Sequence, residues 1–548
     1  MTSKFAYSHG RRQASLLFVG TFPKNRTVYN SGTERVFSGT RICMMVEEWM
    51  RDTLQRRRTA GMLRELRTSE ADGCFVDFTS NDYLGLGRSE ELLRAIQRED
   101  EDARKEAAQR QRRRPRASIA RYPFSREEDE EQSISTMPIV GSGGSRLLSG
   151  NSRYAEELEM WIATFHNREA ALIFNSGYDA NLGLLSCLPG QGDAVVCDEL
   201  VHNSMRMGCR LGRQSHTESF RHSDTGHLDT ILCNLRGESQ VSIGGNIFIA
   251  VESVYSMDGD LAPLAEIVEV AHTHGAAVIV DEAHGTGVFG HEGRGVVHSL
   301  GLESHPALLA TVHTFGKALG VHGAAVVGSK TLKDYLINYA RPLIYSTSLP
   351  FHSLASIRCA YLLQAKADKQ RAHILNLADK FHSALSSDSV PACGSWKPAG
   401  VVQMAGVRGG PPLPPHALPH RHSPIQSVQM PGNERVSAVA SGLRGLGFDV
   451  RAIRAPTVPA GTERLRVTLH AYNTTAEVIS LACHIRFLAR VPEASRSDSA
   501  APGLKLVPCR ESVESNFVPP AGASDQLAGL GQTLMHKVNP GGGIVSRL

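Results

Sequence analysis

A lysine and an acidic cluster, each directly after an apolar run, are the residues whose types and spacing could do chemistry. Lys317 lies in the glycine-bearing segment 313–320, which follows the apolar run 307–312. Upstream, the apolar run 276–280 ends in Asp281-Glu282-Ala283-His284. A lone lysine in such a turn is usually an exposed surface residue. A carboxylate after one strand and a lysine after the next, however, are what pyridoxal phosphate chemistry requires: an amine for a Schiff base and a carboxylate facing the pyridine nitrogen.

Three further polar segments follow predicted strands. Ser176-Gly177-Tyr178 follows the apolar run 170–174 and is predicted to open a helix, where backbone N–H groups bind phosphate, although an ordinary strand-to-helix turn explains it equally well. His202 could stack on a flat cofactor, but a lone histidine more often has a structural role. Ser256 could bind a cofactor oxygen or simply begin a turn.

The elements that must position these residues alternate between strand and helix from Gly141 to about Gly328. This alternation predicts a mostly parallel sheet covered by helices on both faces, which is an α/β fold. In such open sheets, ligands bind at the carboxyl ends of the strands. The predicted strands are 170–174, 194–197, 247–251, 276–280, 308–312 and 324–327.

The remaining sequence predicts a second, smaller α+β domain and several segments without a core. A long helical region, 352–385, precedes the Pro-rich loop 411–424, a helix at 436–446 and strands near 450 and 464–469. Charge blocks of both signs in 98–135 predict a solvated insertion. The predicted divisions are an extension at 1–44, a helix and strand at 45–97 (the helix at 45–68), the insertion at 98–135, a cofactor-binding domain at 136–350, a linking helix and small domain at 351–490, and a disordered tail at 491–548.

Composition excludes some classes of function. The chain has 548 residues and a net charge of +4 from 59 basic and 55 acidic residues, which gives no general argument for nucleic-acid binding. The ten cysteines form no C-x-x-C pair, so neither a metal site nor a disulfide framework is predicted. No apolar run approaches the roughly 18 residues of a membrane span.

Taken together, the motifs from about Asp77 to Arg490 resemble the α-oxoamine synthases, which are fold type I, aminotransferase-like pyridoxal phosphate enzymes with a large domain and a smaller α+β domain. The resemblance rests on six motifs in the family's order. They are Ser80-Asn81-Asp82-Tyr83-Leu84-Gly85, 141–145, Ser256-Met257-Asp258-Gly259, 281–287, 314–317 and Tyr345-Ser346-Thr347-Ser348.

The resemblance implies a role for each matched residue. Lys317 would carry pyridoxal 5'-phosphate as a Schiff base, and Asp281 would pair with its pyridine nitrogen. His284, helped by Ser256, would bond the phenolic oxygen, and His202 would stack on the ring. The implied phosphate-binding residues are Ser176, Gly177, Tyr178 and Thr314, with Ser346 or Thr347 reaching in from the second subunit of a homodimer. The implied substrate-binding residues are Arg64, Asn81, Thr457 and Arg466, with Arg466 holding the amino-acid carboxylate.

Within the family, the segment 454–466 is most similar to members that condense L-alanine with pimeloyl-CoA in biotin biosynthesis. A condensation of glycine with succinyl-CoA, another acyl-CoA–amino acid condensation, and a non-catalytic partner subunit remain alternatives. The terminal Ser546-Arg547-Leu548 resembles a peroxisomal address that an import receptor would read. The basic segment 1–33 leaves the mitochondrion as an alternative, beside the cytosol.

Overall fold

The computed structural model divides the chain into two units, Met1–Ala71 and Asp72–Leu548. The residues that it describes are 39–60, 62–64, 66, 75–113, 140–237, 245–387, 413–414, 418, 420 and 422–490. Most of the predicted extension, the tail 491–548 with its address, and much of the Pro-rich loop therefore lie outside the described residues.

The first unit contains one helix, α1 (Gly39–Thr59), among its described residues. Its bounds differ from the predicted helix 45–68. It begins earlier, within the predicted extension, and it ends earlier, before Gly61, because glycine disfavours helix. Arg56, Arg57 and Arg58 fill the last turn, where positive charge complements the helix dipole. Arg64, which follows the helix, is exposed.

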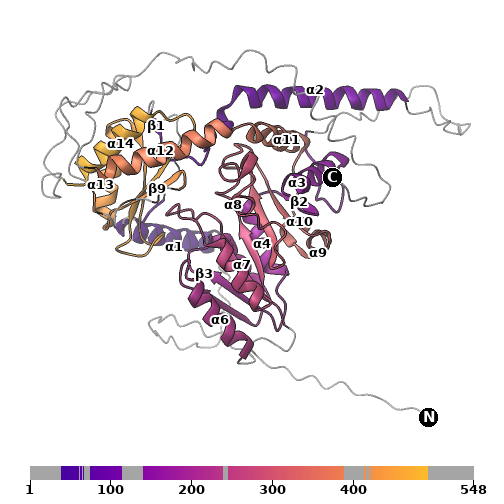
Figure 1. Ribbon diagram of the computed structural model, residues 1–548, viewed down its shortest axis with the longest axis horizontal. Coiled ribbons are helices and arrows are strands. Elements are labelled where there is room, and N and C mark those ends of the chain that lie inside the picture. Colours follow the sequence, from indigo (N-terminus) through magenta and orange to yellow (C-terminus); the bar gives the residue numbers. More distant parts are fainter. Residues whose placement is uncertain are drawn as a thin grey trace, which may run out of the picture. The chain divides into compact units, whose positions relative to one another are not determined.

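The second unit is built around a seven-stranded sheet in the order β2-β8-β7-β6-β5-β3-β4. Its strands β2 and β3 are labelled in Figure 1. Only β8 runs antiparallel to its neighbours, β2 and β7, which confirms the predicted mostly parallel sheet. The strands are β2 (Ala170–Phe174), β3 (Ala194–Asp198), β4 (His216–Phe220), β5 (Ile247–Glu252), β6 (Ala277–Asp281), β7 (Leu308–Thr314) and β8 (Ala324–Gly328). The sequence prediction missed β4, because this edge strand alternates exposed and half-buried polar residues and has no apolar run.

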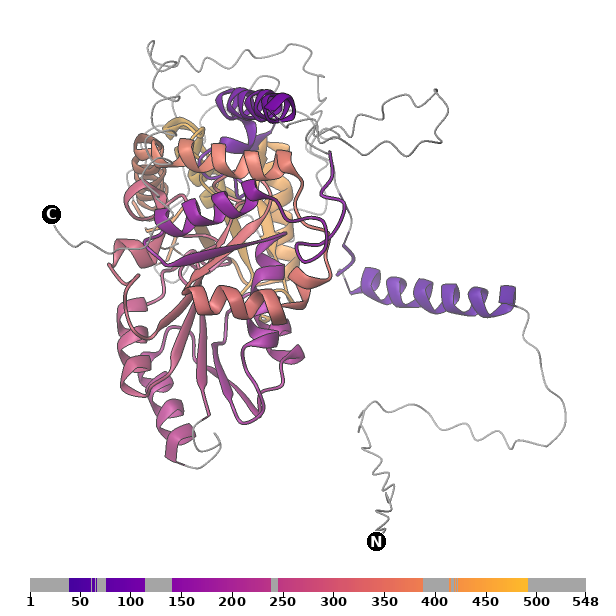
Figure 2. The ribbon, with the colours of Figure 1, turned by 90° about the vertical axis from the view of Figure 1, so that its right-hand side faces the viewer.

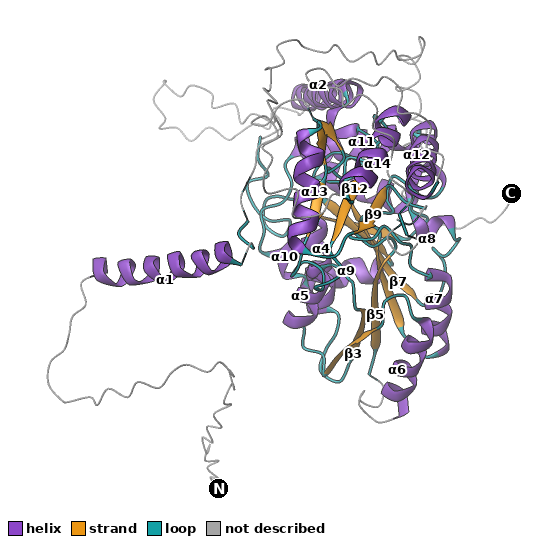
Figure 3. Ribbon diagram, turned by 90° about the vertical axis from the view of Figure 1, so that its left-hand side faces the viewer, coloured by secondary structure: helices purple, strands orange, loops and turns teal. Residues whose placement is uncertain are grey.

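Helices cover both faces of this sheet because successive strand residues point to opposite faces. Val278 and Val280 pack with α6 and α7, whereas Ile279 between them packs with α4, α5 and α9. Figures 2 and 3 show helices on both sides of the sheet. The helices of this part are α3 (Arg153–Phe165), α4 (Gly177–Cys187), α5 (Asn203–Leu211), α6 (Thr225–Gly237), α7 (Leu264–Thr273), η3 (His291–Gly293), α8 (Val296–Ser299), α9 (Lys330–Tyr339), α10 (Arg341–Ile344) and α11 (Phe351–Ala365).

A second core surrounds a three-stranded antiparallel sheet in the order β11-β12-β9 and the parallel pair β1-β10. Its elements are β1 (Val76–Asp77), η2 (Leu86–Arg88), α12 (Asp368–Ser386), β9 (Ile425–Gln429), α13 (Asn433–Gly445), β10 (Phe448–Asp449), β11 (Arg451–Ile453), β12 (Arg464–Thr468) and α14 (Thr475–Leu488). The single helical region predicted at 352–385 is two helices, since α11 packs against the large sheet and α12 against the small one. The boundary between the two hydrophobic cores therefore lies between α11 and α12, and not at residue 350 as predicted.

The prediction of a solvated loop at 98–135 is wrong for its first part. Helix α2 (Glu90–Arg113) continues through residue 113, and residues 114–135 lie outside the described residues. Opposite charges four residues apart support the helix through the pairs Glu90–Arg94 and Asp100–Arg104. The charge blocks that indicated disorder are therefore spaced to stabilise a helix.

Candidate active site

The predicted acidic and lysine segments meet at the carboxyl edge of the large sheet. Asp281 ends β6, Thr314 ends β7, and Lys317 lies in the turn that follows β7. Asp281 is in register with Val312 on one side and with Glu252, the last residue of β5, on the other. Parallel pairing thus gathers strand ends that are far apart in the sequence.

Lys317 is half-buried and directly contacts His284. The distance between Lys317 Nζ and His284 Nε2 is 2.7 Å. Burial lowers the pKa of Lys317 to about 8; the carboxylates of Asp281 and Glu252 oppose this shift and the guanidinium of Arg466 adds to it. The amine is therefore neutral, and nucleophilic, at a lower pH than an ordinary lysine.

His284 is buried between Lys317 and a tyrosine that the sequence prediction did not assign to the site. Its Nδ1 lies 2.5 Å from the hydroxyl oxygen of Tyr83. Burial and the nearby positive charge of Lys317 hold the pKa of His284 well below its usual range, so the ring is neutral. Tyr83 belongs to one of the matched motifs, which was the available signal, but its contact with His284 spans 201 residues of sequence.

Asp281 is buried, and two hydrogen bonds fix its carboxylate. The backbone N–H of Ala283 donates to Oδ1 at 2.9 Å, and the side-chain amide of Asn181 donates to Oδ2 at 2.6 Å. The same amide nitrogen lies 3.1 Å from the Ser204 hydroxyl, which in turn lies 2.7 Å from Nδ1 of His202. One chain of contacts therefore links the two groups predicted to act on the cofactor ring, Asp281 and His202.

Two buried glutamates flank Asp281 and were not predicted. Burial, reinforced by the negative charge of Asp281, raises the pKa of Glu252 to about 8. Burial also raises the pKa of Glu282 to about 7, against hydrogen bonds from the Val297 amide and the Ser253 hydroxyl. Glu252 is therefore mostly neutral near pH 7.

The predicted phosphate-binding turn has the geometry of a helix N-terminus. The Ser176 side chain caps α4 by accepting a hydrogen bond from the Asp179 amide at 3.1 Å. A Cβ added to Gly177 would lie 3.3 Å from both Cβ and Oγ1 of Thr314, so the glycine lets the helix start approach Thr314 closely. The exposed Tyr178 lies edge-on to His202, with 6.3 Å between the ring centroids.

Arg466, predicted to hold a substrate carboxylate, is buried on β12 and lies beside the other matched motifs. Its Nη2 donates to Asn81 Oδ1 at 3.0 Å, and its Nε donates to the backbone carbonyl of Ser256 at 2.7 Å. Asn81 Oδ1 also accepts a weaker bond from the Tyr83 hydroxyl at 3.3 Å. The structure thus joins Arg466 and Asn81 directly, and through Tyr83 to His284.

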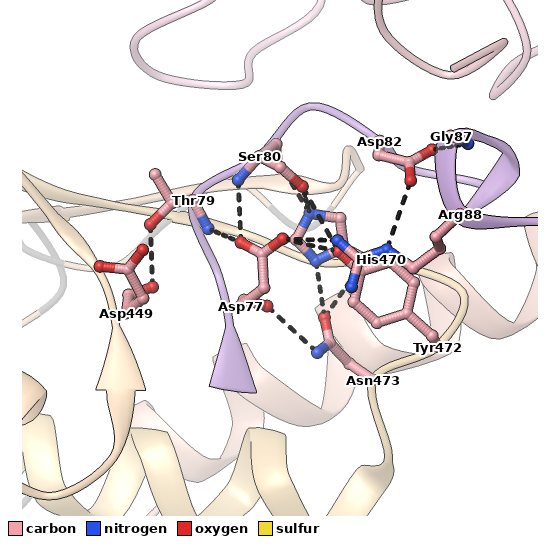
Figure 4. Close-up of polar contacts among 10 residues, drawn as sticks. All are labelled: Asp77, Thr79, Ser80, Asp82, Gly87, Arg88, Asp449, His470, Tyr472 and Asn473. Carbon is pink, nitrogen blue, oxygen red and sulfur yellow. Dashed lines mark hydrogen bonds and ion pairs between the residues drawn. The ribbon is translucent and has the colours of Figure 1, made fainter. Parts of the chain in front are cut away.

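The segment that carries Asn81 and Tyr83 is held by a polar network shown in Figure 4. The backbone amides of Thr79 and Ser80 donate to Asp77 Oδ1 at 2.8 and 3.0 Å, and the Tyr472 hydroxyl donates to Asp77 Oδ2 at 2.9 Å. Although burial opposes it, these amide bonds hold the pKa of Asp77 well below its usual range. The network fixes the position of Asn81 relative to the small domain through His470, whose Nε2 lies 3.0 Å from the Ser80 hydroxyl.

The remaining predicted residues lie in loops. Thr457 is exposed, and its amide donates to the carbonyl of Arg454 in the same loop at 2.9 Å. Ser346 lines a hollow together with Asn175, whose side-chain amide donates to the Thr347 carbonyl at 2.8 Å. No contact of these residues with Lys317 is seen within the described part of the chain, so their roles stay predictions.

The donor set fits pyridoxal phosphate. A neutral-prone amine suits its aldehyde, a buried carboxylate suits its protonated ring nitrogen, and the start of α4 beside Thr314 suits its phosphate. Asn181 Oδ1 is buried without a partner among the described residues, so the Asp281 side of the site is not fully saturated by the protein.

Comparison with known proteins shows the family to which this chain belongs. The family model for aminotransferase class I and II matches residues 75–485, and the chain belongs to this family. An 8-amino-7-oxononanoate synthase of Emericella nidulans is 40% identical over 440 residues, covering 79% of this chain and 93% of the relative. The synthase of the same name from Marinobacter nauticus is 34% identical over 439 residues, covering 78% and 92%.

A solved structure has the same fold. A serine palmitoyltransferase from S. paucimobilis, with a bound PLP–myriocin aldimine, matches with a TM-score of 0.60 and 25% identity, covering 82% of this chain and 98% of that one. Among the described residues, none of the helices is both long and apolar enough to cross a membrane.

Proposed function

We propose that this chain catalyses the pyridoxal phosphate-dependent condensation of L-alanine with pimeloyl-CoA to 8-amino-7-oxononanoate, coenzyme A and carbon dioxide, in biotin biosynthesis. The observation that carries the proposal is the convergence of Lys317, Asp281 and His284 at one sheet edge, in a chain 40% identical to a synthase of that name. An acyltransferase of this kind needs an amine that both holds the cofactor and moves a proton.

Each of the three residues has a distinct task in this reaction. When bound, pyridoxal phosphate supplies an aldehyde that holds the amino acid and a ring that accepts the electrons released at its α-carbon. Lys317 Nζ would accept the α-proton of alanine, because burial lowers its pKa to about 8, so that much of the amine is neutral at that pH. Asp281, fixed by Asn181 and Ala283, would hold the ring nitrogen in its protonated form. The neutral His284 would orient the lysine amine across their 2.7 Å contact.

The proposed substrate-binding group, Arg466, lies on β12 of the smaller domain. Arg466 would hold the alanine carboxylate, since a guanidinium presents a fork of donors. Nε and Nη2 already donate to Ser256 and Asn81, and Nη1 donates to Thr468 Oγ1 at 3.1 Å. These bonds orient the guanidinium before the substrate arrives.

We further propose that the active protein is a homodimer in which Ser346 or Thr347 reaches the partner's phosphate site. Two segments of the surface support this. The turn that carries Leu147 and Leu148 is joined to the segment 345–348 by a bond of 3.0 Å from the Ser348 amide to the Gly144 carbonyl. Leu148 and Tyr345, on these segments, are more than four-fifths exposed. Large exposed apolar side chains gathered in one place are typical of an interface.

The test is a substrate panel with the purified holoenzyme. L-alanine, glycine and L-serine are each combined with pimeloyl-, succinyl- and palmitoyl-CoA, and products are measured by mass spectrometry together with coenzyme A release. We expect alanine with pimeloyl-CoA to give the highest kcat/KM, and Lys317→Ala to lose turnover while its circular dichroism stays that of the native protein.

Other outcomes assign other functions. Preference for glycine with succinyl-CoA, or for serine with palmitoyl-CoA, would replace the proposed substrates within the same chemistry. No turnover with any pair would favour the non-catalytic partner subunit. The peroxisomal location inferred from Ser546-Arg547-Leu548 stays a prediction, which imaging of a tagged protein lacking these residues would test.

A further inference from the structure

Three potential metal ligands converge on the outer surface of the large domain, on α6 and at the end of α7. Asp229 and Cys233 are four residues apart on α6, so they share one face of that helix. His274 caps the C-terminal end of α7. The three donor atoms, a carboxylate oxygen, a thiol sulfur and an imidazole nitrogen, all lie within 4.8 Å of one another.

The distances between the donors fit a shared ion better than a catalytic relay. His274 Nε2 lies 2.7 Å from Asp229 Oδ1 and 4.0 Å from Cys233 Sγ. A Cys–His–Asp relay would use the two ring nitrogens, one toward each partner. Here the same nitrogen faces both partners, so the three donors surround one point. In a tetrahedral zinc site such donors are roughly 3.3–3.6 Å apart, a spacing bracketed by the two distances above and reachable by small rotations of exposed side chains.

The segments that carry the ligands are fixed to each other independently of any ion. Leu228, Ile231 and Leu232 of α6 pack in one core cluster with Ile267 and Val268 of α7. Figures 1 and 3 show the two helices side by side. A site on rigid elements loses little freedom when an ion binds, which favours affinity.

An arginine completes this frame. Arg236, one turn beyond Cys233 on α6, donates through Nε to the His274 carbonyl and through Nη2 to the Gly275 carbonyl, both at 3.0 Å. Its positive charge opposes cation binding, whereas the carboxylate of Asp229 and, once an ion is bound, the sulfur of Cys233 favour it. The C-terminal end of α7 adds a partial negative charge on the same side.

We infer that Asp229, Cys233 and His274 form a binding site for a single zinc-type divalent cation that clips α6 to the end of α7. The donor set is that of Zn²⁺ and Co²⁺, because a thiolate and an imidazole select these ions over Mg²⁺ and Ca²⁺, which prefer oxygen. Cys233 is exposed, so the ion can enter from solvent, the thiol proton leaves to solvent, and water takes the fourth position.

The experiment uses the full-length holoenzyme, stripped of metal with a chelator and titrated with Co²⁺. We expect one equivalent to bind, with visible cobalt bands and a thiolate-to-cobalt charge-transfer band that Zn²⁺ abolishes. Because the cofactor absorbs in the same region, the charge-transfer band is read, for each variant, as the difference between its cobalt-loaded and its zinc-loaded holoenzyme. Zn²⁺ should also raise the thermal unfolding midpoint of the wild type, whereas Mg²⁺ should not.

Matched variants decide whether this site is responsible. Cys233→Ser should abolish the charge-transfer band, and Asp229→Asn and His274→Gln should each weaken cobalt affinity at least by the roughly 10- to 100-fold that losing an outer partner of a metal site costs. Cys187→Ser, which removes a half-buried thiol on α4, should leave binding unchanged. Absence of a saturable cobalt band, or an undiminished band in Cys233→Ser, would overturn the inference. Since His274 precedes β6 at its amino end, whereas Asp281 ends that strand at the edge near Lys317, turnover should be the same in all three ligand variants.

Discussion

At the scale of single residues, the surroundings of Lys317 decide when its amine can react. A neutral amine is the nucleophile, and burial brings the pKa of Lys317 down to about 8. At that pH an ordinary lysine, with a pKa of about 10.4, is less than about one-hundredth neutral. The same lowering would let the side chain hold the cofactor and accept a proton near neutral pH.

We therefore expect the reactivity of Lys317 in the cofactor-free protein to rise with pH through a midpoint near 8. Trace acetylation followed by mass spectrometry measures this for each lysine. Lys330 is the internal control, because its contact with Asp334 raises its pKa, so its acetylation should begin only at higher pH. Superimposable profiles for the two lysines would contradict the argument.

Asn181 is the second residue whose effect can be predicted. Its amide holds Asp281 at 2.6 Å, so Asn181→Ala leaves one oxygen of a buried carboxylate without this donor. A hydrogen bond to a charged group contributes about 1.5–3 kcal/mol of stabilising free energy. Because this bond positions the carboxylate proposed to hold the ring nitrogen, its loss should lower cofactor affinity by roughly 10- to 100-fold. Equilibrium dialysis against pyridoxal phosphate measures this. Asn338→Ala, which alters an exposed asparagine on α9, should bind as the wild type does.

At the scale of elements, one buried glutamate ties together four segments. Glu159 on α3 accepts hydrogen bonds from three segments. The donors are Arg146, in the turn that also carries Leu147 and Leu148, at 2.6 Å, Lys333 on α9 at 2.7 Å, and the amide of Ile173 on β2 at 2.9 Å. Its side chain is fully buried. The turn that carries the predicted interface residues is therefore fixed to the large domain by charge as well as by packing.

Glu159→Gln should destabilise the protein strongly. The change leaves two cations without their buried partner, and breaking such a cluster costs about 3–5 kcal/mol. The thermal unfolding midpoint should fall by several degrees. Glu157→Gln, two residues away on the same helix, removes only the partly exposed pair with Arg153 and should cost less than about 1 kcal/mol. Equal shifts of the unfolding midpoint in the two variants would show that Glu159 stabilises the protein no more than Glu157 does.

At the scale of the whole molecule, the proposed homodimer makes a prediction about shared sites. If Ser346 or Thr347 completes the partner's phosphate site, Lys317→Ala and the double variant Ser346→Ala with Thr347→Ala damage different halves of one site. Each variant alone should be impaired. Dimers mixed from equal amounts should recover about a quarter of wild-type activity, since half of them are mixed pairs with one intact site each.

Activity after mixing is compared with the mean activity of the two parents. Recovery above that mean requires residues from both subunits in one site. Activity equal to the mean would place Ser346 and Thr347 in the site of their own subunit, or outside both sites. Size-exclusion chromatography with light scattering checks that each variant has the same mass as the wild type.

The sequence by itself was enough to predict the chemistry and the large sheet. Lys317 and Asp281 follow apolar runs, and strand periodicity with alternating helices places such residues at one edge of a parallel sheet. The same logic predicted six of the seven strands, because buried strands read as continuous apolar runs. It missed β4 and β9, and it mistook the start of the charged insertion for a loop, because those segments carry polar or mixed patterns.

Only the tertiary structure decided which groups touch the reacting residues. Tyr83 reaches His284 and Arg466 reaches Asn81 across hundreds of residues, so no local spacing reveals either contact. Glu252 has a raised pKa because β5 and β6 pair in a register that sets it beside Asp281 in a buried place. Sequence patterns report local periodicity and the kinds of groups available. Burial and charge pairing arise from long-range packing, and these determine the protonation states on which the chemistry depends.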